Sequence, residues 1–188
     1  MRQYYYELFS LLPFLVCLFW CVILGTELNR RRRSVRNLWN FSLVCTILYF
    51  CHSLSFSSHV VVVPVWSQCL YIMCNLAVYP LFYIYICSMT RLEGPSKWLP
   101  MILLPTLLAG IISGLTAAFG GDLAVIKRMA SVIFALEVLL TGVLGIIDIV
   151  RYRRKVANFY ADTEERALPA LMTLMVLFLV KALYSQGC

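Results

Sequence analysis

The stretch YPLFYIYICSMTRLEGPSKWLPMILLP, residues 79–105, decides the fold, because two apolar runs meet in it across a short polar turn. An apolar run of about 20 residues can cross the roughly 30 Å hydrocarbon core of a bilayer, where only helices and closed barrels satisfy their own backbone groups. The stretch therefore predicts a helical hairpin in a membrane. Gly94-Pro95 supplies the turn. Arg91 and Lys97 place this turn on the cytoplasmic side, since short loops rich in Lys and Arg remain inside.

The composition of the whole chain agrees with the hairpin. Of the 188 residues, 62% are hydrophobic and 13% are charged, whereas a soluble domain has about 45–50% apolar and about 25% charged residues. The apolar excess is spread along the chain, so we predict an all-α integral membrane protein that forms a single domain over residues 1–188. The net charge of +7 comes from cations at the expected helix ends. It is explained by topology signals and anionic headgroups rather than by nucleic acid.

The same criterion, applied along the chain, predicts a bundle of about six transmembrane helices. Gly120-Gly121-Asp122 is expected to turn the chain between the fourth and the fifth of them. The spans are expected at about residues 8–28, 38–54, 65–90, 98–119, 129–150 and 168–184.

Basic residues predict the orientation, with the N-terminus outside. One basic block follows the first span and a second follows the fifth, and both are predicted to lie inside. Lys127 and Arg128 fall on the outer side and are the exception to this assignment. The predicted topology determinants are Arg30, Arg31, Arg32, Arg33, Arg151, Arg153, Arg154 and Lys155.

Glu137 lies within the fifth apolar span. A lone charge that faces lipid costs at least about 2.5 kcal/mol, so an intramembrane carboxylate is a candidate functional group. We predict that Glu137 points into the bundle and is protonated or hydrogen-bonded. The alternative to a functional role is a neutral carboxyl paired with a Ser, Thr or Tyr of another helix. Asp148 lies near the inner boundary and is predicted to be an interfacial partner of Arg151.

Three polar residues of the third span lie within two turns of Pro80. They are Asn75, Tyr79 and Tyr83. A proline inside a helix frees the carbonyl four residues earlier and kinks the helix, which membrane helices tolerate where other groups bind that carbonyl. With Glu137 these three residues are candidates for an intramembrane polar or ligand pocket. Ordinary hydrogen bonding between helices is the alternative.

The spacing of Gly110, Gly114 and Ala118 puts three small residues on one helix face, which favours close helix packing within the bundle. After the fifth span, residues 151–166 place apolar side chains at helical spacing among cations. This second pattern predicts a short helix that lies on the cytoplasmic membrane surface.

No catalytic motif occurs in the chain: GxSxG, HExxH, the P-loop and GxGxxG are all missing. We therefore predict that the protein is not an enzyme and has no cofactor. His52 and His59 flank an expected outer loop, either as a metal-binding or pH-responsive pair or as two exposed loop residues. Seven of the eight cysteines fall in expected spans and are predicted to be thiols rather than disulfides.

Two stretches resemble the membrane-embedded N-terminal region of bacterial AraC-type transcriptional regulators. They are YPLFYIYICSMT with KWLPMILLP, and RYRRKVANFYADTEERALPALM. In that family several helices precede a cytoplasmic helix-turn-helix domain, which has no counterpart after the sixth expected span. The resemblance implies a sensor module in the bacterial inner (cytoplasmic) membrane, truncated before its DNA-binding domain. It implies that the protein contacts the lipid bilayer and either a second copy of itself or another membrane protein. It implies no direct binding of nucleic acid and identifies no particular ligand.

The alternative function is a small multi-span transporter or a subunit of a membrane complex, with Glu137 and the Pro80 kink lining a pathway. Against it, the chain has no internal repeat and no matched pair of broken helices. An integral membrane enzyme is a third interpretation, which the missing catalytic groups disfavour.

Overall fold

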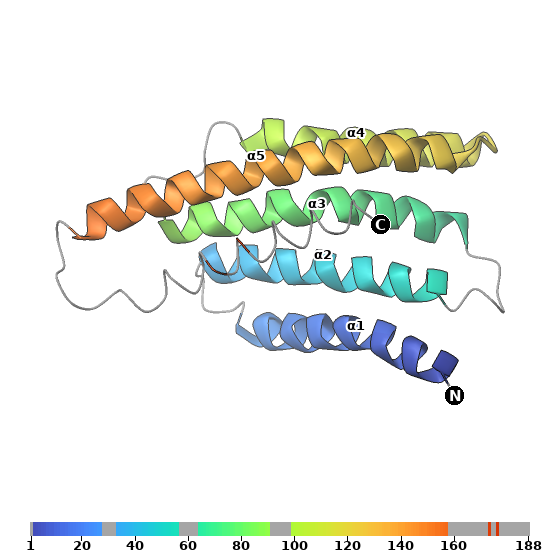
Figure 1. Ribbon diagram of the computed structural model, residues 1–188, viewed down its shortest axis with the longest axis horizontal. Helices are drawn as coiled ribbons and strands as arrows, with labels where there is room; N and C mark the ends of the chain where they lie inside the picture. Colours follow the sequence, from blue (N-terminus) through green and yellow to red (C-terminus); the bar gives the residue numbers. More distant parts are fainter. Residues whose placement is uncertain are drawn as a thin grey trace.

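A helix occupies each of the first five apolar runs of the sequence, as the computed structural model in Figure 1 shows. The structure describes residues 2–27, 33–56, 64–90 and 99–157, together with Thr173 and Val176. Within these residues the chain is all-helical and contains no strand. The helices are α1 (Arg2–Glu27), α2 (Arg33–Phe56), α3 (Val65–Thr90), α4 (Leu99–Ala118) and α5 (Leu123–Ala157).

The helical character of the first five predicted spans is confirmed. The bounds of α3 match the predicted 65–90, because Pro64 precedes the helix and a polar stretch of sequence follows it. The helix continues through Pro80 without interruption. The sixth predicted span, 168–184, lies outside the described residues except for Thr173 and Val176, which are helical.

The predicted turn at Gly120-Gly121-Asp122 ends α4 and begins α5. Gly120 has a φ of 68°, a left-handed conformation that costs glycine little. The N–H of Gly121 donates to the carbonyl of Thr116 at 2.8 Å, and that of Gly120 to Ala117 at 3.3 Å, which is the Schellman pattern of a helix end. Asp122 Oδ1 then accepts from the Ala124 N–H at 2.8 Å and caps the first turn of α5.

The helices form a row in which α3 is the central member. Helix α1 packs on α2, α2 packs on α3, and both α4 and α5 pack on the other side of α3. Figure 1 shows this order, with α1 at one edge and the α4–α5 pair at the other. Contacts between α4 and α5 are fewer than those of either helix with α3. The predicted hairpin of α3 and α4 is thus present as two antiparallel neighbours.

Two polar side chains of α2 bind backbone carbonyls of α1. The indole N–H of Trp39 donates to the Cys21 carbonyl at 3.1 Å, and the Ser42 hydroxyl donates to the Cys17 carbonyl at 3.2 Å. The indole also lies close to Gly25, where a Cβ would be in van der Waals contact with Trp39 Nε1 at 3.4 Å. These contacts set the antiparallel register of α1 against α2.

Helix α5 is longer than predicted. The sequence predicted a span that ends near Val150 and a separate surface helix over 151–166. Instead, α5 continues without a break through Arg151 to Ala157, so the prediction that a separate helix begins at residue 151 is wrong. Residues 158–166 lie outside the described residues. Residues 147–157 contain neither glycine nor proline, and arginine and lysine are good helix formers. The charged residues therefore extend the helix rather than end it.

The small residues of α4 differ in their surroundings, which gives a matched pair of substitutions. A Cβ at Gly110 would lie 2.8 Å from the Met73 side chain, whereas one at Gly114 would meet nothing within 4 Å. Both Gly→Ala changes gain about 0.5–1 kcal/mol of helix propensity. Overpacking costs about 1–3 kcal/mol, and the flexible Met73 favours the low end. We expect Gly110→Ala to be less stable than Gly114→Ala by about 1 kcal/mol in equilibrium unfolding. Equal stabilities would contradict the close α3–α4 contact.

Candidate functional site

The described helices expose large apolar side chains and bury polar ones. On α5, Leu136, Leu140 and Val143 are exposed, while Glu137, Thr141 and Asp148 are buried. Helix α4 shows the same distribution, with Leu107 and Ile111 exposed and Thr106 and Ser113 buried. This arrangement reverses the usual order of a soluble protein. Two helices, α3 and residues 123–152 of α5, are long and apolar enough to cross a membrane, judged by length and composition.

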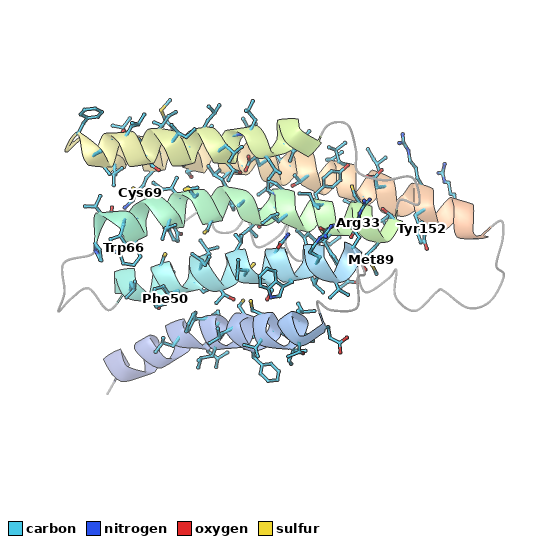
Figure 2. The ribbon with its side chains drawn as sticks, turned by 180° about the vertical axis from the view of Figure 1, so that it is seen from behind. Arg33, Phe50, Trp66, Cys69, Met89 and Tyr152 are labelled. Carbon is cyan, nitrogen blue, oxygen red and sulfur yellow. The ribbon has the colours of Figure 1, made fainter. Side chains whose placement is uncertain are left out.

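Basic residues from distant parts of the sequence lie at one end of the helices. In Figure 2, Arg33, Met89 and Tyr152 lie at this end, whereas Phe50, Trp66 and Cys69 lie at the other. Arg33, Arg151 and Arg154 are exposed. Of the other predicted topology determinants, Arg153 and Lys155 belong to α5. Arg30, Arg31 and Arg32 lie outside the described residues.

Asp148 forms the first polar contact of the site, on α5. It is 8% exposed, and its Oδ2 accepts from the Tyr83 hydroxyl of α3 at 3.0 Å. The Cys87 thiol, one turn further along α3, approaches the same oxygen at 3.7 Å. The prediction of an interfacial partner for Arg151 is therefore wrong, because Asp148 is on the buried face of its helix. The hydroxyl bond of Tyr83 therefore links α3 to α5 inside the bundle.

Glu137 is the second carboxyl of α5, and it has a different environment. It is 5% exposed, so the predicted inward orientation is confirmed. Within the described part of the chain, neither Oε1 nor Oε2 has a hydrogen-bond partner. The alternative of a carboxyl paired with a Ser, Thr or Tyr is thus not observed. Thr141 donates instead to the backbone carbonyl of Glu137 at 2.6 Å.

Thr106 of α4 is a second buried polar group without a partner, and sequence analysis did not identify it. Its side chain is 7% exposed, and Oγ1 has no hydrogen bond within the described residues. The nearest sequence signal is the spacing of Thr106 and Ser113, which puts two hydroxyls on one face of an otherwise apolar helix. That spacing alone does not show which neighbouring helix the hydroxyls meet.

The other predicted pocket residues take separate positions along α3. Tyr79 packs its ring edge on Phe134 with 5.2 Å between ring centroids, which puts it one helical turn from Glu137. Tyr83 lies one turn further on and binds Asp148. Asn75 is half-buried and precedes Leu76, a member of an apolar cluster. Through Phe134, Tyr79 of α3 thus lies about one turn of α5 from Glu137. Tyr83 contacts Asp148 instead.

The remaining candidates from the sequence do not converge. The ring of His52 stacks on Tyr71 with centroids 6.3 Å apart, and His59 lies outside the described residues. Seven cysteines of the described part are present as thiols. Among the described residues, no three His, Cys, Asp or Glu side chains are grouped as metal ligands.

Comparisons with protein-family models, with curated protein sequences and with solved structures found no match to this chain.

Proposed function

We propose that the protein is a multi-pass helical sensor of the bacterial cytoplasmic membrane, with its N-terminus outside. The observation that carries this proposal is a pair of buried polar side chains, Glu137 and Thr106, which have no hydrogen-bond partner among the described residues and lie beneath an apolar exterior. Exposed leucine, isoleucine and valine are stable against lipid tails, and buried polar groups in membrane helices mark functional positions. The resemblance to AraC-type regulators supports the same role.

The length of α5 supports the membrane placement. The apolar segment 129–150 of α5 lies between two pairs of cations. Lys127 and Arg128 precede it, and Arg151 and Arg154 follow it. At 1.5 Å per residue this apolar part is about 33 Å long, close to the roughly 30 Å of the hydrocarbon core. Lys127 and Arg128 would then lie at the outer interface, where long cationic side chains reach the headgroups. This explains the exception to the basic-residue rule.

A sensor needs two states of similar free energy, and the interior of the bundle offers the means. The unpartnered carboxyl and hydroxyl raise the free energy of the present arrangement, so a state in which they bind a partner is favoured. Helix α4 has more contacts with α3 than with α5, which favours a shift of α4 against α5. Helix α5 extends past Arg151 to Ala157 and would carry such a shift to the basic end of the bundle.

The signal is proposed to pass to a second copy or to another membrane protein, with the bilayer as the constant partner and without direct nucleic acid binding. The competing proposal is a small transporter. It is favoured by the buried stripe of Glu137, Thr141 and Asp148 on α5, since such a series of polar groups also forms proton paths.

One experiment separates the two functions. Spin labels at exposed positions 107 of α4 and 140 of α5 report the distance between these helices in lipid vesicles. For a sensor, we expect this distance to change between pH 5 and pH 8, or on addition of Na⁺, without net ion flux. Labels at positions 19 of α1 and 50 of α2, both exposed, serve as the control pair and should not move. An unchanged α4–α5 distance would contradict the sensor, and ion flux that Glu137→Gln abolishes would establish the transporter.

A further inference from the structure

Glu137 and Thr106 lie in the same layer of the bundle, between two apolar clusters. The first cluster contains Ala109 of α4 and Ala130 of α5 with residues of α3. The second contains Ile102 of α4 and has Leu144 of α5 packed against it. On α4, Thr106 lies between Ile102 of the second cluster and Ala109 of the first. On α5, Glu137 lies midway between Ala130 of the first cluster and Leu144, which packs on the second. Both groups are therefore at the same height along the bundle.

A third oxygen belongs to this layer, from α3. Pro80 has no N–H, so the Leu76 carbonyl lacks its usual helical donor. A helix carbonyl points along the axis toward the residue four positions later, so this oxygen lies between Leu76 and Pro80 along α3. Leu76 is fully buried and packs in the cluster with Ala109 and Ala130, so its side chain faces α4 and α5. A carboxyl, a hydroxyl and a carbonyl from three helices thus lie in one layer of the bundle.

No positive charge of the described helices is available to the Glu137 carboxyl. Helices α3 and α4 contain no Lys or Arg. On α5 the nearest cations are Arg128 and Arg151, which are nine and fourteen residues away, or about 13 and 21 Å along the axis. Of the titratable side chains on the packed helices, Tyr79 of α3 contacts Phe134, one turn from Glu137, and helix α4 has none. Tyr83 and Cys87 of α3 bind Asp148, which lies eleven residues from Glu137 on α5. The described residues therefore supply no neutralising charge, which favours a ligand as its source.

We propose that Glu137, Thr106 and the Leu76 carbonyl form a binding site for one compact monovalent cation, a proton or Na⁺. This inference rests on the proposed membrane placement and names the stimulus of the sensor. One carboxylate balances one positive charge. Oxygen atoms are the ligands that hard cations select, and a proton on Glu137 would be donated to the hydroxyl or the carbonyl. Asp148 is a separate group, because it already holds the Tyr83 hydroxyl.

The infrared carbonyl band of a protonated carboxylic acid tests the site in the full chain reconstituted in lipid. We expect this band at neutral pH in the wild-type protein, its loss as the pH rises, and its absence in Glu137→Gln. Labelling glutamate with ¹³C in the wild-type protein separates the band from that of Asp148 without any substitution. If added Na⁺ lowers the band at constant pH while choline does not, the ligand is Na⁺ in competition with the proton. If neither cation changes it, the ligand is the proton alone.

The threonines of α4 supply a matched control. Thr106→Val should weaken binding roughly two- to tenfold, the value of one hydrogen bond between neutral groups. Thr116→Val should leave binding unchanged, because the Thr116 hydroxyl binds only the Ile112 carbonyl of its own helix. Equal effects of the two variants would remove Thr106 from the site. A Glu137 that is ionised at every pH and indifferent to Na⁺ would overturn the proposal, whatever the α4–α5 distance does. An unchanged distance with normal binding would instead contradict only the sensor.

Discussion

Glu137→Leu is expected to stabilise the folded protein by about 1–3 kcal/mol, although it removes the most polar buried side chain of the α5 midsection. The physical reason is that both carboxyl oxygens are buried without a hydrogen-bond partner in the described structure. A buried polar group in this condition costs roughly 1–3 kcal/mol, and an apolar side chain of similar size avoids the cost. Reversible unfolding in mixed micelles at a fixed pH would measure the gain. The same variant should lose cation binding, so stability and function would change in opposite directions.

Leu136→Glu is the control for position, because it adds a carboxyl on the outer face, one residue from the buried Glu137. Leu136 is 62% exposed, and a charged group that faces lipid costs about 2.5–3.5 kcal/mol. This variant should therefore be destabilised, with the opposite sign to Glu137→Leu. If Glu137→Leu is instead less stable than the wild-type protein, the carboxyl has a stabilising partner and the assignment of the layer is wrong.

Local sequence signals were sufficient to predict where the helices lie. They were insufficient to predict which side chains of different helices contact each other. Pro64 and the polar sequence after Thr90 mark both ends of α3, so its bounds could be predicted. The end of α5 was placed too early because the cations after Val150 indicate where a membrane ends, which differs from where a helix ends. Backbone hydrogen bonds continue through Ala157, since no glycine or proline interrupts them.

The buried contacts of the site depend on pairing between helices, and this explains what the sequence left open. Asp148 was assigned to the interface because Arg151 lies one turn away. Its spacing from Glu137 is eleven residues, or three turns, which places both carboxyls on the same helix face. That spacing is a usable signal for burial. It does not reveal that Asp148 meets Tyr83 while Glu137 meets no donor, because these outcomes depend on how α5 is rotated and shifted against α3 and α4.

Tyr83→Phe is expected to destabilise the protein by about 1–3 kcal/mol, the range for a buried group that loses its hydrogen-bond partner. The Tyr83 hydroxyl donates to Asp148 Oδ2 at 3.0 Å, and both side chains are buried. Tyr85→Phe is the matched control on α3. Tyr85 is half-buried with its ring 6.3 Å from that of Phe82, and its hydroxyl has no hydrogen bond in the described structure. Its loss should change the unfolding free energy by less than about 0.5 kcal/mol.

A double-mutant cycle would show that the Tyr83 effect belongs to this contact. Asp148→Leu leaves the Tyr83 hydroxyl buried without its acceptor and should cost about 1–3 kcal/mol. When both partners are apolar, no polar group is left unpaired, so the double variant should be more stable than the sum of the single effects predicts. We expect a coupling free energy of about 1–3 kcal/mol, within the range for residues in contact. Additive effects would contradict a direct bond between α3 and α5 and would leave Asp148 to be stabilised by other groups, such as the Cys87 thiol at 3.7 Å.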